Sequence, residues 1–278
     1  MRILIATNDT SHSKVATQYG LMLAKRTGAK LTLMHVIRNL DERSIGNARL
    51  KEQGKLARRL GLKADLILRT GLPAEQIIHY AHEGEEDLIV LGGGSRASLL
   101  RRTIAPTAER VVANAPCPVL IVRSSRRQAL NFLILHSGQE GLATIERFLG
   151  HAGKLIRKKC NVTLLHVMSQ MGASYKVEDW ELRAEADELI RKGTLEGKWL
   201  KQGMAVLKRG RKVQIVPKVR HGLVIDEILK EVEQGDYDVV VLGSHRKGGW
   251  TDILMDDISK QVIARVKRPV LIVQGKSG

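Results

Sequence analysis

The chain has 278 residues, 43% of them hydrophobic and 27% charged, which is typical of a globular protein with its own buried core. No apolar run approaches the roughly 18 residues of a membrane-spanning helix, so no membrane insertion is expected. The net charge of +17 favours anionic partners, whereas 3% aromatic residues disfavour a base-stacking surface for single-stranded nucleic acid. Cys117 and Cys160 have no ligand-like spacing, so neither a disulfide nor a metal site is expected.

Apolar runs separated by glycine and proline predict alternating strands and helices in the first half. The expected strands cover residues 2–7, 31–36, 64–69, 88–92 and 118–122. The expected helices run from Thr10 to Gly28, from Ser44 to Leu60, from Pro73 to His82 and from Pro106 to Ala113. Because the sequence starts directly with a strand, we expect no signal peptide and a cytoplasmic protein.

The same order of elements returns in the second half. The expected strands cover residues 132–135, 162–167, 213–219, 239–242 and 270–273. The first expected helix ends near Lys158, and a long helical stretch begins at Glu178. A further helix begins at Val224, and the last lies near Ser259.

An internal repeat explains this doubling. Residues 87–96, DLIVLGGGSR, return at 238–247 as DVVVLGSHRK, and the proline-started last strands at 118 and 269 match as well. The differences 238 − 87 and 269 − 118 both equal 151, whereas His35 and His166 are offset by 131, so the second half carries extra residues in its second helix and loop. We therefore expect two tandem domains, residues 1–124 and 130–278, that pack together through their last strands.

Taken together, the repeated motifs resemble the universal stress protein family, once per half. The residues that carry the resemblance are Arg2–Thr7, Leu33–Val36, Leu164–Val167, Arg69–Gly71, Arg220–Gly222 and the two closing strands. The resemblance implies an α/β fold of two doubly wound, five-stranded parallel-sheet domains in tandem, which is Rossmann-like and adenine nucleotide alpha hydrolase-like. The last strands would pair antiparallel, giving a pseudo-dimer within one chain, with a further homodimer as an added option.

Nucleotide-binding members of this family carry Gly-x-x-Gly, nine residues, and then Gly-Ser/Thr after the fourth strand. The first half keeps Gly92 but has Ser95 and then Ala105-Pro106, and proline supplies no N–H for a phosphate. The second half keeps Gly243 but has Arg246 and then Asp256-Asp257, whose charges would repel a phosphate. The base-facing aspartate of the family is replaced by Asn8 in one half and Ser137 in the other.

The candidate nucleotide-binding residues follow from this comparison. In the first half they are Asn8, Asp9, Val36, Gly92, Gly93, Ser95, Arg96 and Thr107, and in the second half Gly243, His245 and Arg246. Each has a simpler alternative: Asp9 as a solvated turn residue, the arginines as surface charge, and Gly92 and Gly93 as turn residues. His35 and His166, inside apolar strands, are interpreted as hydrogen-bonded core histidines.

No repeated Ser/His/Asp set, Walker lysine or carboxylate pair is present, so no catalytic residue is assigned and an enzyme is not expected. The leading hypothesis is a stress-response binding or signalling protein with a degenerate nucleotide site and an unidentified protein partner. The first alternative is a functional ATP or AMP binder that uses the first half. The second is a basic protein that associates with nucleic acid or another polyanion, to which the cluster Lys208–Lys212 would contribute.

Overall fold

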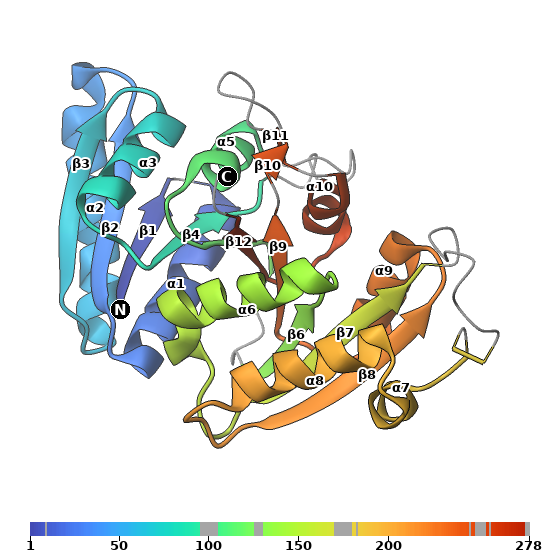
Figure 1. Cartoon of the computed structure of the whole chain (residues 1–278). Helices are drawn as coiled ribbons and strands as arrows, with labels where there is room; N and C mark the ends of the chain where they lie inside the picture. The colour runs from blue at the N-terminus through green and yellow to red at the C-terminus, as the bar shows by residue number, and fades with distance from the viewer. Residues whose placement is uncertain are drawn as a thin grey trace.

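The computed structural model of the chain is an α/β assembly in which a twisted sheet runs through the whole molecule (Figure 1). The structure describes residues 1–8, 10–94, 105–124, 130–169, 180–181, 183–244, 246–247, 254–255 and 257–275. No helix within these ranges is both long and apolar enough to cross a membrane.

The first half follows the predicted order of elements. Its strands are β1 (Arg2–Thr7), β2 (Lys30–Ile37), β3 (Ala64–Thr70), β4 (Leu88–Gly92) and β5 (Val119–Val122). Its helices are α1 (Ser11–Thr27), η1 (Leu40–Glu42), α2 (Arg43–Arg59), α3 (Pro73–Glu83) and α5 (Pro106–Asn114). Thr10 caps α1 through its side chain, and Gly28 ends that helix with a left-handed φ of 66°, so α1 lies within the predicted bounds.

The second half repeats this order with an enlarged second helical region. Its strands are β6 (Asn131–Leu135), β7 (Asn161–Met168), β8 (Gln214–His221), β9 (Val239–Ser244) and β12 (Val270–Gln274), with a small hairpin of β10 (Arg246–Lys247) and β11 (Leu254–Met255). Its helices are α6 (Gln139–Ala152), η2 (Gly153–Leu155), α7 (Ala186–Lys192), α8 (Leu195–Lys208), α9 (Val224–Gln234) and α10 (Asp257–Arg265).

Two predictions for these helices were wrong. The first helix does not extend to Lys158, because α6 ends at Ala152 and one turn of 3-10 helix follows. The long helix expected from Glu178 is broken inside the described part of that stretch. Gly193 takes a left-handed φ of 70° there, and Thr194 caps the next helix by accepting the N–H of Gly197.

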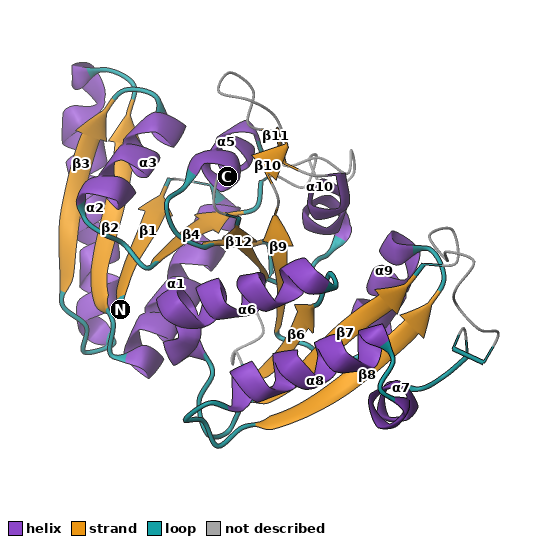
Figure 2. Cartoon of the chain, viewed as in Figure 1, coloured by secondary structure: helices purple, strands orange, loops and turns teal. Residues whose placement is uncertain are grey.

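All the long strands form one ten-stranded sheet in the order β3-β2-β1-β4-β5-β12-β9-β6-β7-β8. Within each half the neighbouring strands are parallel, and the halves meet where β5 and β12 pair antiparallel, with Leu120 opposite Leu271. The sheet thus confirms the predicted tandem fold and its central pairing. Helices cover both faces (Figure 2). Buried residues of α1, α2, α6 and α8 form the core on one face, and those of α3, α5, α9 and α10 form it on the other.

Hydrogen bonds across the centre hold the halves together beyond the strand pairing. The buried guanidinium of Arg123 donates to the carbonyl oxygens of Gly93 and Ile263, and so ties the end of β4 to α10 of the other half. Ser124 donates to the carbonyl of Lys267 at 2.6 Å. The side chain of Gln274 donates to the carbonyl of Val112 on α5. The two halves therefore form one continuous body.

Candidate functional site

A cavity of about 380 Å³ opens at the carboxyl ends of β1 and β4 in the first half. Strand order reverses at this point, since β2 and β3 lie on one side of β1 while β4 and β5 lie on the other. Open α/β sheets bind ligands in the crevice at such a reversal. The volume also falls within the range of small-molecule sites.

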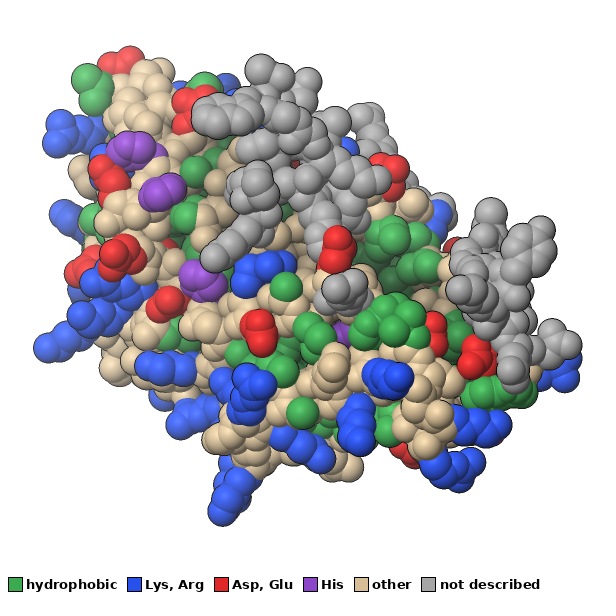
Figure 3. All heavy atoms as spheres, in the orientation of Figure 1, with side chains coloured by type: hydrophobic (Ala, Val, Ile, Leu, Met, Phe, Trp, Pro, Cys, Tyr) green, Lys and Arg blue, Asp and Glu red, His purple; other side chains and the backbone are tan. Residues whose placement is uncertain are grey.

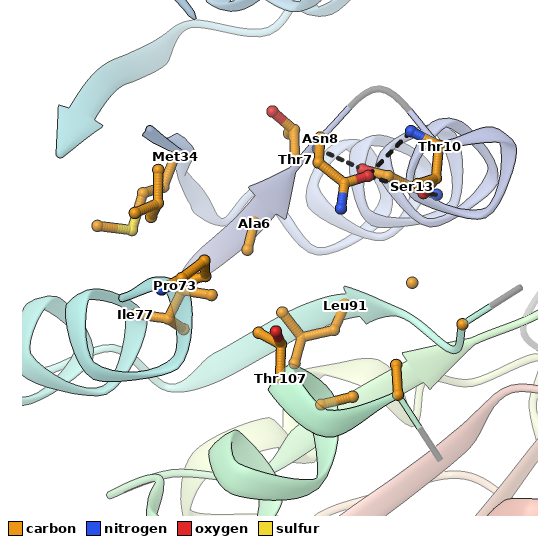
Figure 4. A pocket seen from close by; sticks show the side chains of 15 residues that line it. Ala6, Thr7, Asn8, Thr10, Ser13, Met34, Pro73, Ile77, Leu91 and Thr107 are labelled. Carbon is orange, nitrogen blue, oxygen red and sulfur yellow. Dashed lines mark hydrogen bonds between the residues drawn. The ribbon is translucent and has the colours of Figure 1, made fainter. Parts of the chain in front are cut away.

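The walls of the cavity combine an apolar part with polar side chains from two separate elements (Figure 4). The apolar part comes from β1, β2, β4 and the start of α3, namely Ala6, Met34, Val36, Pro73, Ile77 and Leu91. The polar part comes from the turn after β1 and from the start of α5, namely Thr7, Asn8, Thr10, Ser13 and Thr107. Of the predicted first-half residues, Asn8, Val36, Gly92 and Thr107 therefore line one cavity.

The turn between β1 and α1 is fixed by its own side chains. Asn8 Oδ1 accepts hydrogen bonds from the backbone N–H and the hydroxyl of Thr10, at 3.0 and 2.7 Å. Ser13 Oγ accepts from the N–H of Asn8, and Thr10 Oγ1 accepts from the N–H of Ser13. The amides that begin α1 are therefore partly satisfied within the protein, and Asn8 lies at the rim of the cavity rather than being free to reorient (Figure 4).

Gly92 and Gly93 serve different purposes. A Cβ atom at Gly92 would lie 3.0 Å from the backbone of His12 and Ser13, so only glycine lets the end of β4 approach the start of α1 this closely. A Cβ at Gly93 would lie 2.3 Å from Arg123 Cγ. Gly93 thus packs against the side chain that links the halves and does not line the cavity.

Helix α5 begins at the cavity with few capping interactions. Ala105 occupies the N-cap position without any side-chain hydrogen bond, and Pro106 follows in the first turn. Thr107 and Ala108 both line the cavity, and their N–H groups belong to the helix start that lacks a side-chain cap. Glu109, also in the first turn, adds a negative charge to this helix end.

Several predicted residues lie outside the described residues, namely Asp9, Ser95, Arg96 and His245. Arg246 belongs to β10, where it pairs with Met255 of β11. Asp257 is the first residue of α10 and is exposed, whereas its neighbour Asp256 is also outside the described residues.

The second half has an equivalent but smaller cavity of about 210 Å³. It lies at the ends of β6 and β9 and beside α9, and Gly243 takes the place of Gly92. Two lining positions carry larger side chains in the second cavity. Leu135 replaces Ala6 of the first half, and Ile258 replaces Thr107. The exchange also removes a hydroxyl, so the second cavity is smaller and more apolar. We did not predict this narrowing from the sequence, although aligning the two halves would have shown it.

The core histidines behave largely as predicted. The imidazole Nδ1 of His35 is 2.8 Å from the carbonyl of Thr7, and that of His166 is 2.9 Å from the carbonyl of His136. His136, which was not predicted from the sequence, is buried, and neither ring nitrogen has a hydrogen-bond partner among the described residues. Burial, together with the nearby His166, lowers the pKa of His136 to about 4, so its ring is neutral near pH 7.

Sequence comparison agrees with this architecture. The profile of the universal stress protein family matches residues 1–123 and 141–274. The chain belongs to the universal stress protein family.

Relatives of this universal stress protein match either the whole chain or one half. A universal stress protein of Mycolicibacterium smegmatis is 23% identical over 98% of this chain and 96% of its own length. One from Methanocaldococcus jannaschii is 28% identical over 46% of this chain and 84% of its own length. The crystal structure of a universal stress protein from Archaeoglobus fulgidus superposes with a TM-score of 0.71 at 18% identity, covering 98% of both chains. That structural likeness supports the tandem fold.

Proposed function

We propose that this protein binds one adenine nucleotide, ATP or AMP, in its first half, through a degenerate site, and acts as a stress-response binding or signalling protein. The observation that supports the proposal is the difference between the two equivalent cavities, about 380 Å³ against 210 Å³. We expect the larger cavity to accommodate an adenosine and the smaller one to exclude it. On this proposal residues 1–124 form the ligand-binding domain and residues 130–278 form its partner domain.

The apolar and polar walls suit different parts of a nucleotide. Met34, Val36 and Ile77 would contact the flat faces of the base, and the polar groups around Asn8 would face its edge or the ribose. Phosphates would lie toward Gly92, Gly94 and the start of α5, where N–H groups and the helix dipole favour anions.

The same end of the site accounts for its degenerate character. Pro106 removes one N–H donor from the start of α5, and Glu109 adds a negative charge to its first turn. We therefore expect weak binding, with little gain from additional phosphates. ATP and AMP should then bind with similar affinity, unlike at a phosphate loop with a full set of donors.

A binding role fits the chemistry of the cavity better than catalysis does. Its described lining has hydroxyl and amide groups but contains no carboxylate, imidazole, thiol or amine. General acid–base catalysis needs a group whose pKa lies near the working pH, and these groups do not provide one.

The test is calorimetric titration of ATP and of AMP into the wild type, one double variant and one control variant. Ala6→Leu with Thr107→Ile gives the first cavity the side chains of the second. These side chains are already accommodated at the equivalent positions of the other half. We therefore expect them to destabilise the fold less than a substitution of Gly92, where a Cβ would contact backbone atoms. We expect one equivalent of nucleotide to bind the wild type and none to bind this variant.

A substitution outside both equivalent cavities provides the control. Gly150→Ala, at an exposed helix position with open space around the Cβ, should leave binding unchanged. Binding that survives Ala6→Leu with Thr107→Ile would show that the nucleotide occupies another site. No binding to the wild type at millimolar nucleotide would refute the proposal.

A further inference from the structure

A second recessed surface lies at the opposite end of the sheet, beside the amino-terminal ends of the strands. Two adjoining cavities of about 600 and 550 Å³ share Lys154, Gly210 and Arg211. Six cationic side chains line them, namely Lys154, Arg157, Lys158, Arg209, Arg211 and Lys212. We call this surface the basic groove. It joins η2 and the start of β7 to the loop between α8 and β8, and it reaches the end of α1 in the first half through Thr27.

The six cations are not neutralised by neighbouring acids. None of them forms an ion pair with a carboxylate of the described residues. The carboxylate in the lining is Asp87, at the far end of the second cavity, where it faces the amino terminus at 3.6 Å and His151 at 3.9 Å. Repulsion between like charges without counterions destabilises the folded protein, and a bound anionic ligand would relieve that repulsion.

Backbone carbonyls hold two of the guanidinium groups in place. Arg157 donates to the carbonyl of Arg26 across the boundary between the halves. Arg211 donates to the carbonyl of Arg209 at 3.0 Å, and it lies over Gly153, where a Cβ would come within 2.9 Å of Arg211 Nη2. A carbonyl orients a guanidinium without cancelling its charge, so these groups remain available to an anion.

The positive charge continues beyond the groove along the same edge. Helices α1, α2 and α8 all end there, and their last turns carry Lys25, Arg26, Arg58, Arg59 and Lys208. Figure 3 shows Lys and Arg side chains spread along the lower border of the molecule, with few acidic side chains between them. These residues complement the helix dipoles, but Arg157, Lys158, Arg211 and Lys212 of the groove lie outside helices and have no such explanation.

We propose that the basic groove binds the phosphate backbone of double-stranded nucleic acid without reading its sequence. A duplex is a stiff, extended polyanion, which suits an edge that is basic across both halves. The lining contains no Phe, Tyr or Trp side chain on which unpaired bases could stack. A membrane surface fits less well, because none of the exposed large hydrophobic side chains lies in the groove.

Fluorescence anisotropy with a labelled DNA duplex of about 20 base pairs, over roughly 50 to 200 mM salt, tests this proposal. If all six cations contact phosphates, the slope of log K against log salt should be about −5. The variant Lys154→Gln, Lys158→Gln, Lys212→Gln should reduce the slope to about −3 and weaken binding about tenfold. Duplexes of unrelated sequence should bind equally.

The matched control is Lys14→Gln, Arg38→Gln, Arg43→Gln, which removes the same charge from exposed positions near the other edge of the sheet. It should retain most of the affinity and the steep salt slope. An equal loss of affinity in both triple variants would show that binding depends on net charge alone, and would contradict binding at the basic groove. Binding to inorganic polyphosphate or anionic vesicles without binding to the duplex would overturn the proposed ligand, as would no duplex binding at the lowest salt. Circular dichroism should show that both variants fold.

Discussion

Ala6 and Leu135 occupy the same place in the two halves of the sheet, each on the first strand of its half, opposite Met34 and Leu165 respectively. Both side chains line the cavity of their own half. Thr107 and Ile258 form a second such pair, and in both pairs the larger side chain lines the smaller cavity. A shared backbone therefore carries one open site and one that its own side chains largely fill.

Reversing the exchange should open the second cavity without creating a second nucleotide site. Leu135→Ala with Ile258→Thr removes apolar volume, so unfolding by denaturant should show a loss of about 2 to 3 kcal/mol. The stoichiometry of nucleotide should remain one, because Asp257 still starts α10 and disfavours phosphate there. Calorimetry that found two equivalents in this variant would show that side-chain volume alone closed the second site.

Glu231 anchors a buried cluster of charges in the second half. It is 1% exposed, and it accepts hydrogen bonds from Lys218, Arg220 and the hydroxyl of Tyr237. Burial alone would raise the pKa of Glu231, but these hydrogen bonds, that of Lys218 foremost, hold it below the usual value. Glu231→Gln should cost about 3 kcal/mol, since two cations lose their buried partner.

The destabilisation caused by Glu231→Gln should become smaller at acid pH. A carboxyl whose pKa is lowered on folding stabilises the protein above its unfolded pKa and loses that stabilisation as the pH falls below it. The difference between wild type and Glu231→Gln should therefore shrink below about pH 4.5. Glu83→Gln is the control, because Glu83 pairs with Arg69 in an exposed bridge of the first half. Its effect should stay within about 0.5 kcal/mol.

His136 should make stability depend on pH in a higher range. The unfolded chain takes up a proton on this ring near pH 6.5, whereas the folded state resists protonation until about pH 4. Stability from this group is complete above pH 6.5 and falls by up to roughly 1.4 kcal/mol per pH unit between these values. In His136→Leu, the free energy of unfolding should depend less steeply on pH over this interval. An unchanged slope in the variant would contradict the neutral, unpartnered ring.

Two glycines on the same face should respond in opposite directions to alanine. At Gly197 a Cβ would lie 2.1 Å from the carbonyl oxygen of Leu189, so Gly197→Ala should force α7 and α8 apart and cost about 2 kcal/mol. At Gly150 a Cβ meets nothing within 4 Å, and Gly150→Ala should stabilise α6 by roughly 0.5 to 1 kcal/mol. Thermal unfolding of the two variants tests the pair directly. Similar midpoints would show that the helices can separate at no cost.

Local patterns made most of the fold predictable. Apolar strands, the Thr10 cap and Gly28 located the elements, and the matched strands ending each half predicted the pairing of β5 with β12. The sequence did not reveal that Gly193 divides the long helix, because a glycine inside a helical pattern is not a sure helix end.

The sites were predictable only in part. The resemblance to nucleotide-binding family members suggested Asn8, Val36, Gly92 and Thr107 as candidates, and these four residues line the first cavity. The sequence could not show that Gly93 packs on Arg123, nor that residues 154–158 lie beside residues 209–212. Those contacts join segments far apart in the chain, and neither segment has a pattern that indicates the other.

The antiparallel joint between β5 and β12 has a consequence for how the two halves can diverge. Separate subunits that met in this way would come apart on dilution, and each would have to keep every function of the pair. Tethering in one chain makes the effective concentration of the partner strand high and independent of how much protein is present. One half is then free to lose its ligand and acquire new surface chemistry, provided that its last strand still covers that of its neighbour.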